Sequence, residues 1–466
     1  MLSKPGRCAR IGLAAAIVLA MVPTTAVRGA DGPTLKSYNA AIGDSSISGI
    51  SSGAFMAVQF GVAWSSIIKG IGIVAGGPFY CAQAGVLPAA PAIRPCMAGP
   101  PPDLQPMIAE AEAKAAAGQV DPLDNIKRQK IYLFHGYNDV VIARSVTDAT
   151  AGFYRRYLGD AGRGNLYYQG ALGAGHSFVV NEPHGRDLNG CPSNRSPYID
   201  ECGYDQAGII LQHIYGALHP ATIGPLGGTI RSFNQNRYTG DHIADALGMG
   251  DEGYVYVPRA CEQGAACRVH VAMHGCQQDV GTIGRLFVEH TGYNAWADAN
   301  NIIVLYPQAK ASVLLPINPN ACWDWWSYIE YDDGYITKAG LQIAAIKAML
   351  DALTAGAEGP VPAPTEGRDP AELIVTDTSD TAAALAWTPV AGAASYRIRR
   401  AGTDGVFRVV GETPGPSYAD QGLAPATPYA WQVAAVIGGI EQSPLMIVRA
   451  TTRPTPPACD APGTCP

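Results

Sequence analysis

Short apolar runs alternate with longer helical stretches throughout residues 31–357. Strands of a parallel sheet are buried on both faces and read as continuous apolar runs, while the stretches between them supply the covering helices. The pattern predicts strands at 45–50, 70–75, 130–135, 165–169, 253–257, 268–273 and 302–306, and helices at 52–65, 204–218, 290–300 and 338–353. We therefore expect an α/β domain over residues 31–357.

A different pattern follows. Residues 371–452 show strand-like runs at short spacing, which is typical of a β-sandwich. Trp387, Tyr396 and the stretch LAPATPY, which ends at Tyr429, match the core tryptophan, core tyrosine and tyrosine corner of fibronectin type III domains, which this segment resembles. An unrelated immunoglobulin-like sandwich is the alternative. The segment contains no histidine, so we expect a spacer or weak adhesin rather than a catalytic unit.

Composition indicates the character of the three segments outside these two regions. Residues 358–370, EGPVPAPTEGRDP, are rich in Pro and Gly and predict an interdomain linker, and residues 453–466 form a Pro- and Cys-containing tail. In residues 1–30, three basic residues precede a run of 12 apolar residues, and small residues follow. This layout predicts a secretory signal peptide cleaved after Ala26 or Ala30. A membrane anchor is disfavoured because a span needs about 20 apolar residues.

Charge narrows the class of partner. The 466 residues carry a formal net charge of -7 and no run of Lys or Arg longer than two, which argues against a nucleic-acid partner. We expect a secreted, extracellular protein that has no membrane span and needs no cofactor. The sequence does not fix the oligomeric state, and a monomer is favoured.

Cysteine parity points to disulfides. Eleven cysteines are present, and Cys8 leaves with the signal peptide, so an even number remains in an exported chain. The residues do not decide the pairing. The favoured pairing closes four short loops and one longer bridge: Cys81 to Cys96, Cys191 to Cys202, Cys261 to Cys267, Cys459 to Cys465, and Cys276 to Cys322. A metal site is disfavoured, because no CxxC occurs and no His stands at zinc-ligand spacing from a Cys pair.

The candidate nucleophile lies in residues 49–53, GISSG, between a predicted strand and a predicted helix. A nucleophile elbow needs this setting, because the two glycines let strand and helix crowd together while the hydroxyl of Ser51 stays exposed at the turn. The alternative is a glycine-rich turn with a solvated serine. The flanking strand and helix favour Ser51 as the nucleophile.

A serine nucleophile needs a general base, and His176 is the best placed histidine. It lies in GAGHSF, a loop of small residues just beyond the predicted strand NLYYQ. Such a loop can lay an imidazole over the edge of the sheet. His135, in IYLFHGYND, is the main alternative, but it ends an apolar strand and is interpreted as a core or supporting histidine.

The candidate acid is Asp139, just beyond the end of the strand at 130–135. In an α/β-hydrolase sheet the acid follows one strand and the histidine a later one, in the chain order Ser, Asp, His. Asp139 fits that order between the nucleophile and the base. Asp148 and Asp160 are alternatives that do not directly follow an apolar strand.

An oxyanion hole in this fold combines the amide after the nucleophile with an amide from a loop after an earlier strand. Ser52 supplies the first. The best second source is VHVAMHGCQQD, whose strand ends at residues 274–276, but it follows His176 instead of preceding the serine. If residues 225–306 supply the early strands and residues 45–170 the late ones, the sheet is complete and its chain ends have moved. We therefore predict a circularly permuted α/β-hydrolase sheet.

Six short sequence segments together resemble those of a known protein family. GISSGAFMAVQ, AGGPFYC, FHGYNDVV, GAGHSF, VAMHGCQQ and NACWDWWSY, in this order, resemble the circularly permuted catalytic domains of extracellular polyhydroxyalkanoate (poly-3-hydroxybutyrate) depolymerases over roughly residues 35–355. Some members of that family carry a fibronectin type III linker followed by a polymer-binding domain. Here the fibronectin-like segment is followed by TTRPTPPACDAPGTCP.

The resemblance implies an ester substrate and a role for each site residue. Ser51 would attack the ester carbonyl, His176 would take and return the proton, and Asp139 would orient the imidazole. The amides of Ser52 and Cys276 would hold the oxyanion. The resemblance also implies that Trp323, Trp325 and Trp326 line a binding crevice, because rigid indoles suit an aliphatic polyester. The alternative is that two of these tryptophans are core residues.

Three functions remain open from the sequence. The first is a polyhydroxyalkanoate depolymerase that releases oligomers and monomers. The second is another secreted carboxylesterase, such as a feruloyl or acetyl esterase acting on plant polysaccharide, which would use the same triad with a different acyl pocket. The third is a binding protein whose sandwich domain is the active part, which the complete set of Ser, Asp, His and oxyanion residues disfavours.

Overall fold

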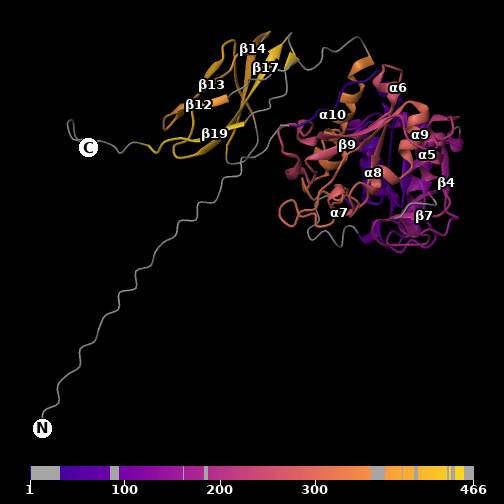
Figure 1. The fold of residues 1–466 in the computed structure, drawn as a ribbon. Helices are drawn as coiled ribbons and strands as arrows, with labels where there is room; N and C mark the ends of the chain where they lie inside the picture. The colour runs from indigo at the N-terminus through magenta and orange to yellow at the C-terminus, as the bar shows by residue number, and fades with distance from the viewer. Residues whose placement is uncertain are drawn as a thin grey trace, which may run out of the picture.

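The computed structural model describes residue 1 and residues 32–83, 94–160, 162–182, 187–357, 373–390, 392–402, 408–437, 440–441 and 447–455. The expected signal peptide, the linker and most of the tail therefore lie outside the described residues. An α/β body spans the elements up to residue 357, and a β-sandwich follows from residue 373 (Figure 1). Each has a hydrophobic core of its own.

The α/β body is built on an eight-stranded sheet of order β4-β3-β2-β1-β10-β11-β9-β8. Neighbouring strands from β4 to β11 are parallel, and β9 is antiparallel to both of its neighbours. The strands are β1 Ser45–Ile50, β2 Ile68–Val74, β3 Lys130–Phe134, β4 Leu166–Gln169, β8 Thr229–Asn234, β9 Glu252–Val257, β10 Arg268–Met273 and β11 Ile302–Tyr306. All seven strands predicted in this region are present, and β8 was not predicted.

The strand order confirms the circular permutation. If β8 to β11 are numbered 1 to 4 and β1 to β4 are numbered 5 to 8, the strands lie in the sheet in the order 1-2-4-3-5-6-7-8, which is that of an α/β-hydrolase sheet. The loop that carries Cys276 then follows the third strand, and Ser51, Asp139 and His176 follow later strands in turn, as the candidate roles require in that fold. The ends of the domain touch, because the Tyr38 N–H donates to Leu353 O at 2.9 Å. Adjacent chain ends allow such a rearrangement without disturbing the core.

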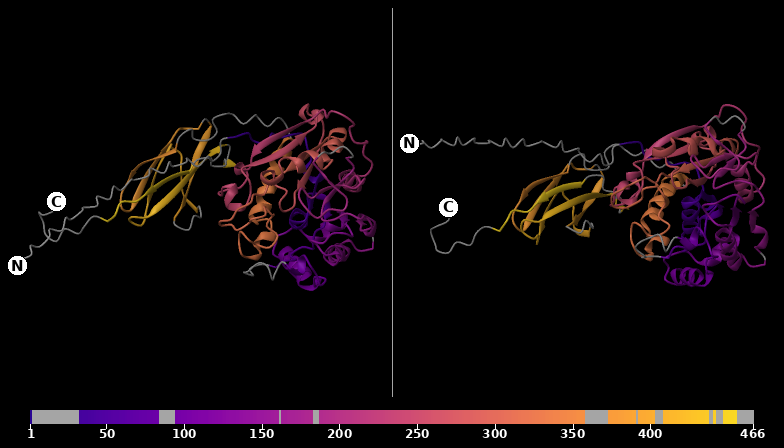
Figure 2. Two further views of the ribbon diagram at one scale, coloured as in Figure 1. Left: turned by 60° about the horizontal axis from the view of Figure 1, so that its bottom comes forward. Right: turned by 90° about the horizontal axis from the view of Figure 1, so that it is seen from below.

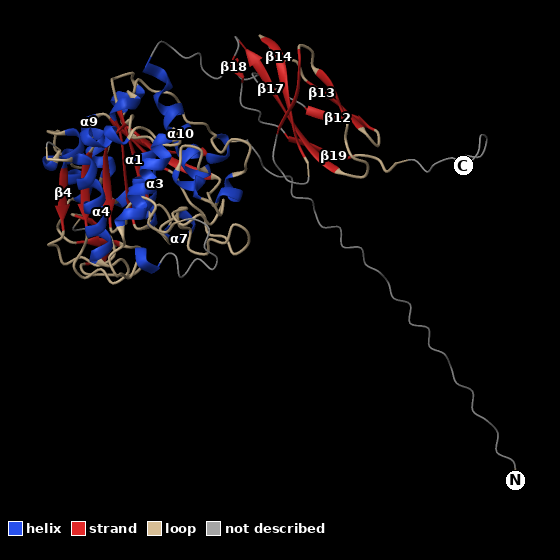
Figure 3. Cartoon of the chain, turned by 180° about the vertical axis from the view of Figure 1, so that it is seen from behind, coloured by secondary structure: helices blue, strands red, loops and turns tan. Residues whose placement is uncertain are grey.

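Helices cover both faces of the sheet. α1, α3, α4 and α10 pack on one face, seen toward the viewer in Figure 3, and α5, α8 and α9 pack on the other (Figure 1). The helices are α1 Ser52–Ala63, α3 Leu104–Ala116, α4 Arg144–Leu158, α5 Gln206–Tyr215, α6 Arg259–Glu262, α7 Val280–Ile283, α8 Leu286–His290, α9 Tyr293–Asn300 and α10 Leu341–Thr354. The four predicted helices correspond to α1, α5, α9 and α10. Helices α3 and α4 were not predicted.

The centre of the sheet is fixed by β1 and α1, in which every residue is buried. A helix that is apolar all round has no solvent face and must lie inside the protein, as α1 does. Two polar residues of β1 are paired: the hydroxyls of Ser46 and Ser48 lie 2.7 and 2.8 Å from the two ring nitrogens of His270. Burial lowers the pKa of His270 to about 3, so the imidazole is neutral.

A small three-stranded sheet of order β5-β7-β6 lies between β4 and β8 in the chain. Its strands are β5 Phe178–Val180, β6 Asn189–Gly190 and β7 Ile199–Glu201. This sheet begins directly after the loop that carries His176.

The C-terminal region is a fibronectin type III sandwich, as its pattern predicted. One sheet has the order β12-β13-β16 and the other β15-β14-β17-β18, with β19 paired to β17. Figure 2 shows this sandwich, coloured orange to yellow, from two further sides. Trp387 and Trp431 are buried, and the Tyr429 hydroxyl accepts the Ala424 N–H at 2.9 Å, which is the expected tyrosine corner. The strands are β12 Leu373–Thr378, β13 Ala382–Trp387, β14 Ala393–Ala401, β15 Arg408–Thr413, β16 Ser417–Gln421, β17 Pro428–Ile437, β18 Ile440–Glu441 and β19 Ile447–Thr451.

Disulfides form where parity and spacing favoured them. The four bridges are Cys81–Cys96, Cys191–Cys202, Cys261–Cys267 and Cys276–Cys322. The expected partners Cys459 and Cys465 lie outside the described residues. Among the helices that are described, none has the length and apolarity needed to cross a membrane.

Candidate active site

The candidate nucleophile lies on a strained turn at the carboxyl end of β1. Ser51 has φ 55° and ψ -124°, a conformation that few residues other than glycine adopt, and its N–H is held by Val74 O at 2.9 Å. The glycines of GISSG are sterically required. A Cβ on Gly49 would lie 2.3 Å from the Gly53 carbonyl, and a Cβ on Gly53 would lie 2.3 Å from His274 O. This turn exposes the Ser51 hydroxyl to the cavity described below.

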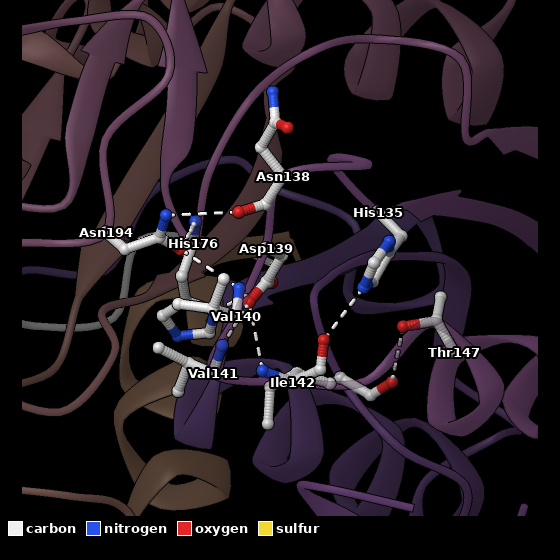
Figure 4. Close-up of polar contacts among 10 residues, drawn as sticks. His135, Asn138, Asp139, Val140, Val141, Ile142, Thr147, His176 and Asn194 are labelled. Atoms are coloured by element: carbon white, nitrogen blue, oxygen red, sulfur yellow. Dashed lines mark hydrogen bonds and ion pairs between the residues drawn. The ribbon is translucent and has the colours of Figure 1, made fainter.

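Two loops bring Asp139 and His176 together. The acid loop, residues 135–143, follows β3, and the histidine loop, residues 170–177, follows β4. Asp139 Oδ2 lies 2.9 Å from His176 Nδ1, and both side chains are almost fully buried (Figure 4). The other oxygen, Oδ1, accepts the N–H groups of Val141 and Ile142 at 2.8 and 2.9 Å. The carboxylate is therefore held on both sides. It fixes a proton on His176 Nδ1 and leaves Nε2 as the basic atom.

The charge of Asp139 follows from the same contacts. Burial by itself would raise its pKa, but the hydrogen bond and charge of His176, together with the two amide donors, lower the pKa below its ordinary value of 3.8. The group therefore stays ionised at neutral pH.

The alternative residues lie elsewhere. His135 is buried, and its Nε2 donates to Ile142 O at 2.8 Å, so it supports the acid loop (Figure 4). Asp148 lies on α4 with about half of its side chain exposed. Asp160 pairs with Arg163 beside a hollow of about 530 Å³ whose lining contains neither serine nor histidine.

Two backbone amides are available at the nucleophile. In the described part of the chain, neither the Ser52 N–H nor the Cys276 N–H donates to a protein acceptor. Ser52 is the first residue of α1, where helical N–H groups have no partner within the helix and the helix dipole favours negative charge. Gly53 brings the turn and the loop after β10 into contact, so the two amides come from adjoining segments. Both have the character of oxyanion donors.

The loop that carries Cys276 is shaped by buried polar contacts. His274 is fully buried, and its Nε2 accepts the Ala309 N–H at 3.0 Å, which requires a neutral ring. Burial lowers the pKa of His274 in agreement with this. The Gly275 N–H donates to Gln278 Oε1 at 2.7 Å, and the Cys276–Cys322 bridge ties the loop to residues 322–326, which contain the three tryptophans. These contacts fix the direction of the Cys276 amide.

Ser51 and His176 open into one cavity of about 360 Å³. In the described residues no hydrogen bond joins Ser51 Oγ to His176. In hydrolases without substrate this distance is often long, and the hydrogen bond forms when substrate binds. The rest of the lining is largely apolar and includes Phe55, Met97, Val141, Ile142, Tyr198, Cys276, Gln277, Asn318, Pro319, Asn320, Cys322, Trp325 and Trp326. A largely apolar cavity with a few polar groups is typical of a small-molecule binding site.

The three tryptophans have different positions. Trp325 and Trp326 line the cavity, and Trp325 stacks on Phe55 with ring centroids 4.2 Å apart. Trp323 is fully buried and does not line the cavity, which corrects the expectation that all three indoles face substrate. Its Nε1–H donates to His274 O at 3.0 Å, so it supports the loop that carries Cys276. A buried indole N–H needs such an acceptor.

An apolar loop stands beside the cavity. Val313, Leu314 and Leu315 are 82%, 77% and 78% exposed. The loop is closed at its base by two backbone hydrogen bonds: the Ser312 N–H donates to Asn318 O at 2.8 Å, and the Asn318 N–H donates to Ser312 O at 2.9 Å. Exposed apolar side chains held in an ordered loop next to a cavity mark a contact surface.

Several of these residues carry no signal in the sequence. Met97 and Tyr198 reach the cavity from long connections, and Asn194, which contacts the histidine loop, lies between two cysteines without a motif. Within the described residues, no group of three or more His, Cys, Asp or Glu side chains is placed to hold a metal ion.

In this permuted α/β-hydrolase sheet, a serine and a histidine line one cavity, and an aspartate is bonded to that histidine. This arrangement is that of a serine ester hydrolase. The chain is 40% identical over 397 residues to the poly(3-hydroxybutyrate) depolymerase of Delftia acidovorans, covering 84% of this chain and 75% of that protein. It is 35% identical over 335 residues to the polyhydroxybutyrate depolymerase of Talaromyces funiculosus, covering 70% and 94%. The chain belongs to the poly(3-hydroxybutyrate) depolymerase family.

A solved structure agrees with this membership. The PHB depolymerase from Penicillium funiculosum matches with a TM-score of 0.63 and 35% identity, over 70% of this chain and 99% of that one. A serine-to-alanine form of a PHB depolymerase, solved with an R3HB trimer, matches equally well. No family model matches the chain.

Proposed function

We propose that this protein is a secreted enzyme that hydrolyses the ester bonds of polyhydroxyalkanoate, such as poly(3-hydroxybutyrate), through an acyl-enzyme on Ser51. One observation carries the proposal: Ser51 and His176 share an apolar cavity, and Asp139 holds the imidazole by a 2.9 Å hydrogen bond. The relatives described above are named for this polymer, and the family supplies the substrate class.

Acylation uses each group once. His176 Nε2 accepts the proton of Ser51 as Oγ attacks the ester carbonyl carbon, and Asp139 stabilises the resulting imidazolium. The carbonyl oxygen becomes an oxyanion and accepts the N–H groups of Ser52 and Cys276. When the intermediate collapses, the C–O bond to the leaving alcohol breaks, and His176 returns its proton to that alcohol oxygen.

Deacylation repeats the sequence with water. A water molecule gives a proton to His176 and attacks the acyl carbon, and the oxyanion again uses the amides of Ser52 and Cys276. Collapse breaks the bond to Ser51 Oγ, which takes the proton from His176. The product is a hydroxyacid or a shorter oligomer with a new carboxyl end, and the enzyme is restored.

The surroundings of the triad favour an insoluble aliphatic polyester. Phe55, Trp325 and Trp326 give the cavity rigid apolar walls, which bind an aliphatic chain with little loss of conformational entropy. The exposed loop that contains Leu314 and Leu315 extends an apolar surface next to the cavity, where a solid polymer would lie. The four disulfides agree with an oxidising, extracellular setting.

The deciding experiment compares two substrates. The purified protein is incubated with a poly(3-hydroxybutyrate) film and, separately, with acetylated xylan. We expect soluble hydroxyacids and oligomers from the film and little acetate from xylan, because the walls of the cavity are apolar. Acetate release from xylan together with an unattacked film would assign the protein to the polysaccharide esterases instead.

We further propose that the fibronectin type III domain is a spacer that takes no part in bond cleavage. It has its own core around Trp387, Tyr396 and Trp431. A chain ending at residue 357 should hydrolyse a soluble p-nitrophenyl ester at nearly the full-length kcat, and any loss should appear on solid polymer, where residence at the surface raises the effective concentration of sites. A several-fold fall on the soluble ester, in protein shown to be folded by circular dichroism, would contradict this.

A further inference from the structure

A third segment contacts the two catalytic loops. The segment closed by the Cys191–Cys202 disulfide places the carboxamide of Asn194 between the acid loop and the histidine loop (Figure 4). Asn194 Oδ1 accepts the His176 N–H at 2.7 Å and the Val140 N–H at 3.2 Å. Its Nδ2 donates to Asn138 O at 3.1 Å. The carboxamide therefore bonds to the backbone of both loops at once.

These bonds lie where other pairing between the two loops has ended. The backbone of the acid loop pairs with the histidine loop through Tyr137 N–H to Leu172 O and Asn138 N–H to Ala174 O, each at 3.0 Å. Beyond that point, Asn194 holds the backbone N–H groups of Val140, which follows Asp139, and of His176. Among the described residues, the two loops are otherwise joined there by the 2.9 Å hydrogen bond between the Asp139 and His176 side chains.

The Asn194 segment is itself firmly held. The Ser193 N–H donates at 2.8 Å to the buried carboxylate of Asp200. Its backbone packs against the histidine loop so closely that a Cβ on Gly175 would lie 1.8 Å from Ser193 O. A disulfide, a buried carboxylate and direct backbone contact thus fix the position of Asn194, which makes it a rigid reference for both loops.

We infer that Asn194 is a positioning residue that sets the geometry of the Asp139–His176 pair. This inference rests on the catalytic roles proposed above. Asn194 does not line the cavity, so it acts on proton transfer and not on substrate binding. Loss of its carboxamide frees the His176 backbone to shift, and a displacement of about 1 Å at a catalytic group can cost about 100-fold in rate.

The chain offers a matched control for this residue. Asn189 lies just outside the same disulfide, and its Nδ2 donates to Arg195 O at 2.9 Å, inside the segment. It bonds to neither catalytic loop. Asn189→Ala therefore removes a hydrogen bond from the same region, and any general loosening of the segment affects both variants.

The test measures kcat and KM on a soluble p-nitrophenyl ester, the thermal midpoint, and the rate at which a fluorophosphonate labels Ser51. Asn194→Ala is expected to lower kcat and the labelling rate together by about 10- to 100-fold, with KM changed by less than about twofold. Asn189→Ala is expected to leave both rates near those of the unmodified protein. Asn194→Asp keeps the acceptor for the two N–H groups and is expected to retain more activity than Asn194→Ala.

Three results would overturn the inference: equal kcat losses in Asn194→Ala and Asn189→Ala, a loss for Asn194→Ala that lies in KM alone, or an Asn194→Asp variant no better than Asn194→Ala. Failure of the underlying catalytic assignment is read separately. A Ser51→Ala protein that still hydrolyses the ester refutes the proposed nucleophile. An inactive Ser51→Ala protein beside a fully active Asn194→Ala protein refutes the positioning role alone.

Discussion

Replacing Ser51 by alanine is expected to lower kcat for ester hydrolysis by about 10⁴-fold or more, with a much smaller effect on KM. The substitution removes the attacking oxygen and leaves the apolar walls of the cavity intact. His176→Ala should cause a loss of the same order, because it removes the acceptor of the same proton. The double variant should be hardly slower than either single one, since residues that act as one unit are not additive.

The measurement is kcat and KM on a soluble ester, with His290→Ala as the control for the histidine. His290 is partly exposed and lies 3.0 Å from a carboxylate oxygen of Glu182, outside the cavity. That variant should keep kcat unchanged. A Ser51→Ala protein with more than about a tenth of the original activity, or fluorophosphonate labelling at another serine, would refute the assignment.

Asp139→Asn should lower kcat by about 10⁴-fold while leaving the shape of the site almost unchanged. The oxygen that accepts the N–H groups of Val141 and Ile142 must remain an oxygen, so the new amide nitrogen faces His176 Nδ1. An amide donor there requires Nδ1 to be unprotonated, which moves the ring proton to Nε2. The imidazole then has no lone pair with which to take the proton of Ser51.

Asp148→Asn is the matched control, because this carboxylate is exposed on α4 and bonds to Tyr168. It should leave kcat unchanged. Wild-type activity in Asp139→Asn would show that the carboxylate does not set the tautomer of His176.

The lowered pKa of Asp139 also predicts how stability depends on pH. Because the folded-state pKa lies below the ordinary value of 3.8, the ionised carboxylate stabilises the fold at pH values above that ordinary value. This contribution disappears as the pH falls through the lowered pKa. The difference in unfolding free energy between the unmodified protein and Asp139→Asn, measured by denaturant unfolding at several pH values, should therefore shrink on acidification.

The parts of the fold that the sequence predicts are those in which local chemistry is decisive. The runs of β2, β3, β10 and β11 are largely apolar and buried, as expected for strands of a parallel sheet that is covered on both faces. Steric requirements at Gly49 and Gly53 leave the elbow as the one turn that fits GISSG. The order of the motifs along the chain was enough to predict the permuted sheet.

The parts that escaped prediction depend on tertiary contacts. β8 is half exposed and reads TIRSFN, so it lacks the alternation of a typical edge strand. α4 contains two Thr residues and a Gly, and it is stabilised by packing against the sheet rather than by helix propensity. Asn194 has no sequence signature, because its role exists only where three separate segments meet. Trp323 and Trp325 are two residues apart, and only the fold decides which of them faces the cavity.

The hydrogen bond between Tyr38 and Leu353 shows that the first and last segments of the α/β domain lie side by side. Residue 40 bridges to residue 267, directly before β10, so these segments lie at the amino ends of the central strands, whereas the Ser51 hydroxyl lies at their carboxyl ends. A domain joined to either end of the α/β domain is therefore attached at the edge of the sheet opposite to the Ser51 site. Accessory domains can be exchanged, or moved from one terminus to the other, and the cavity at Ser51 remains accessible to a solid polymer.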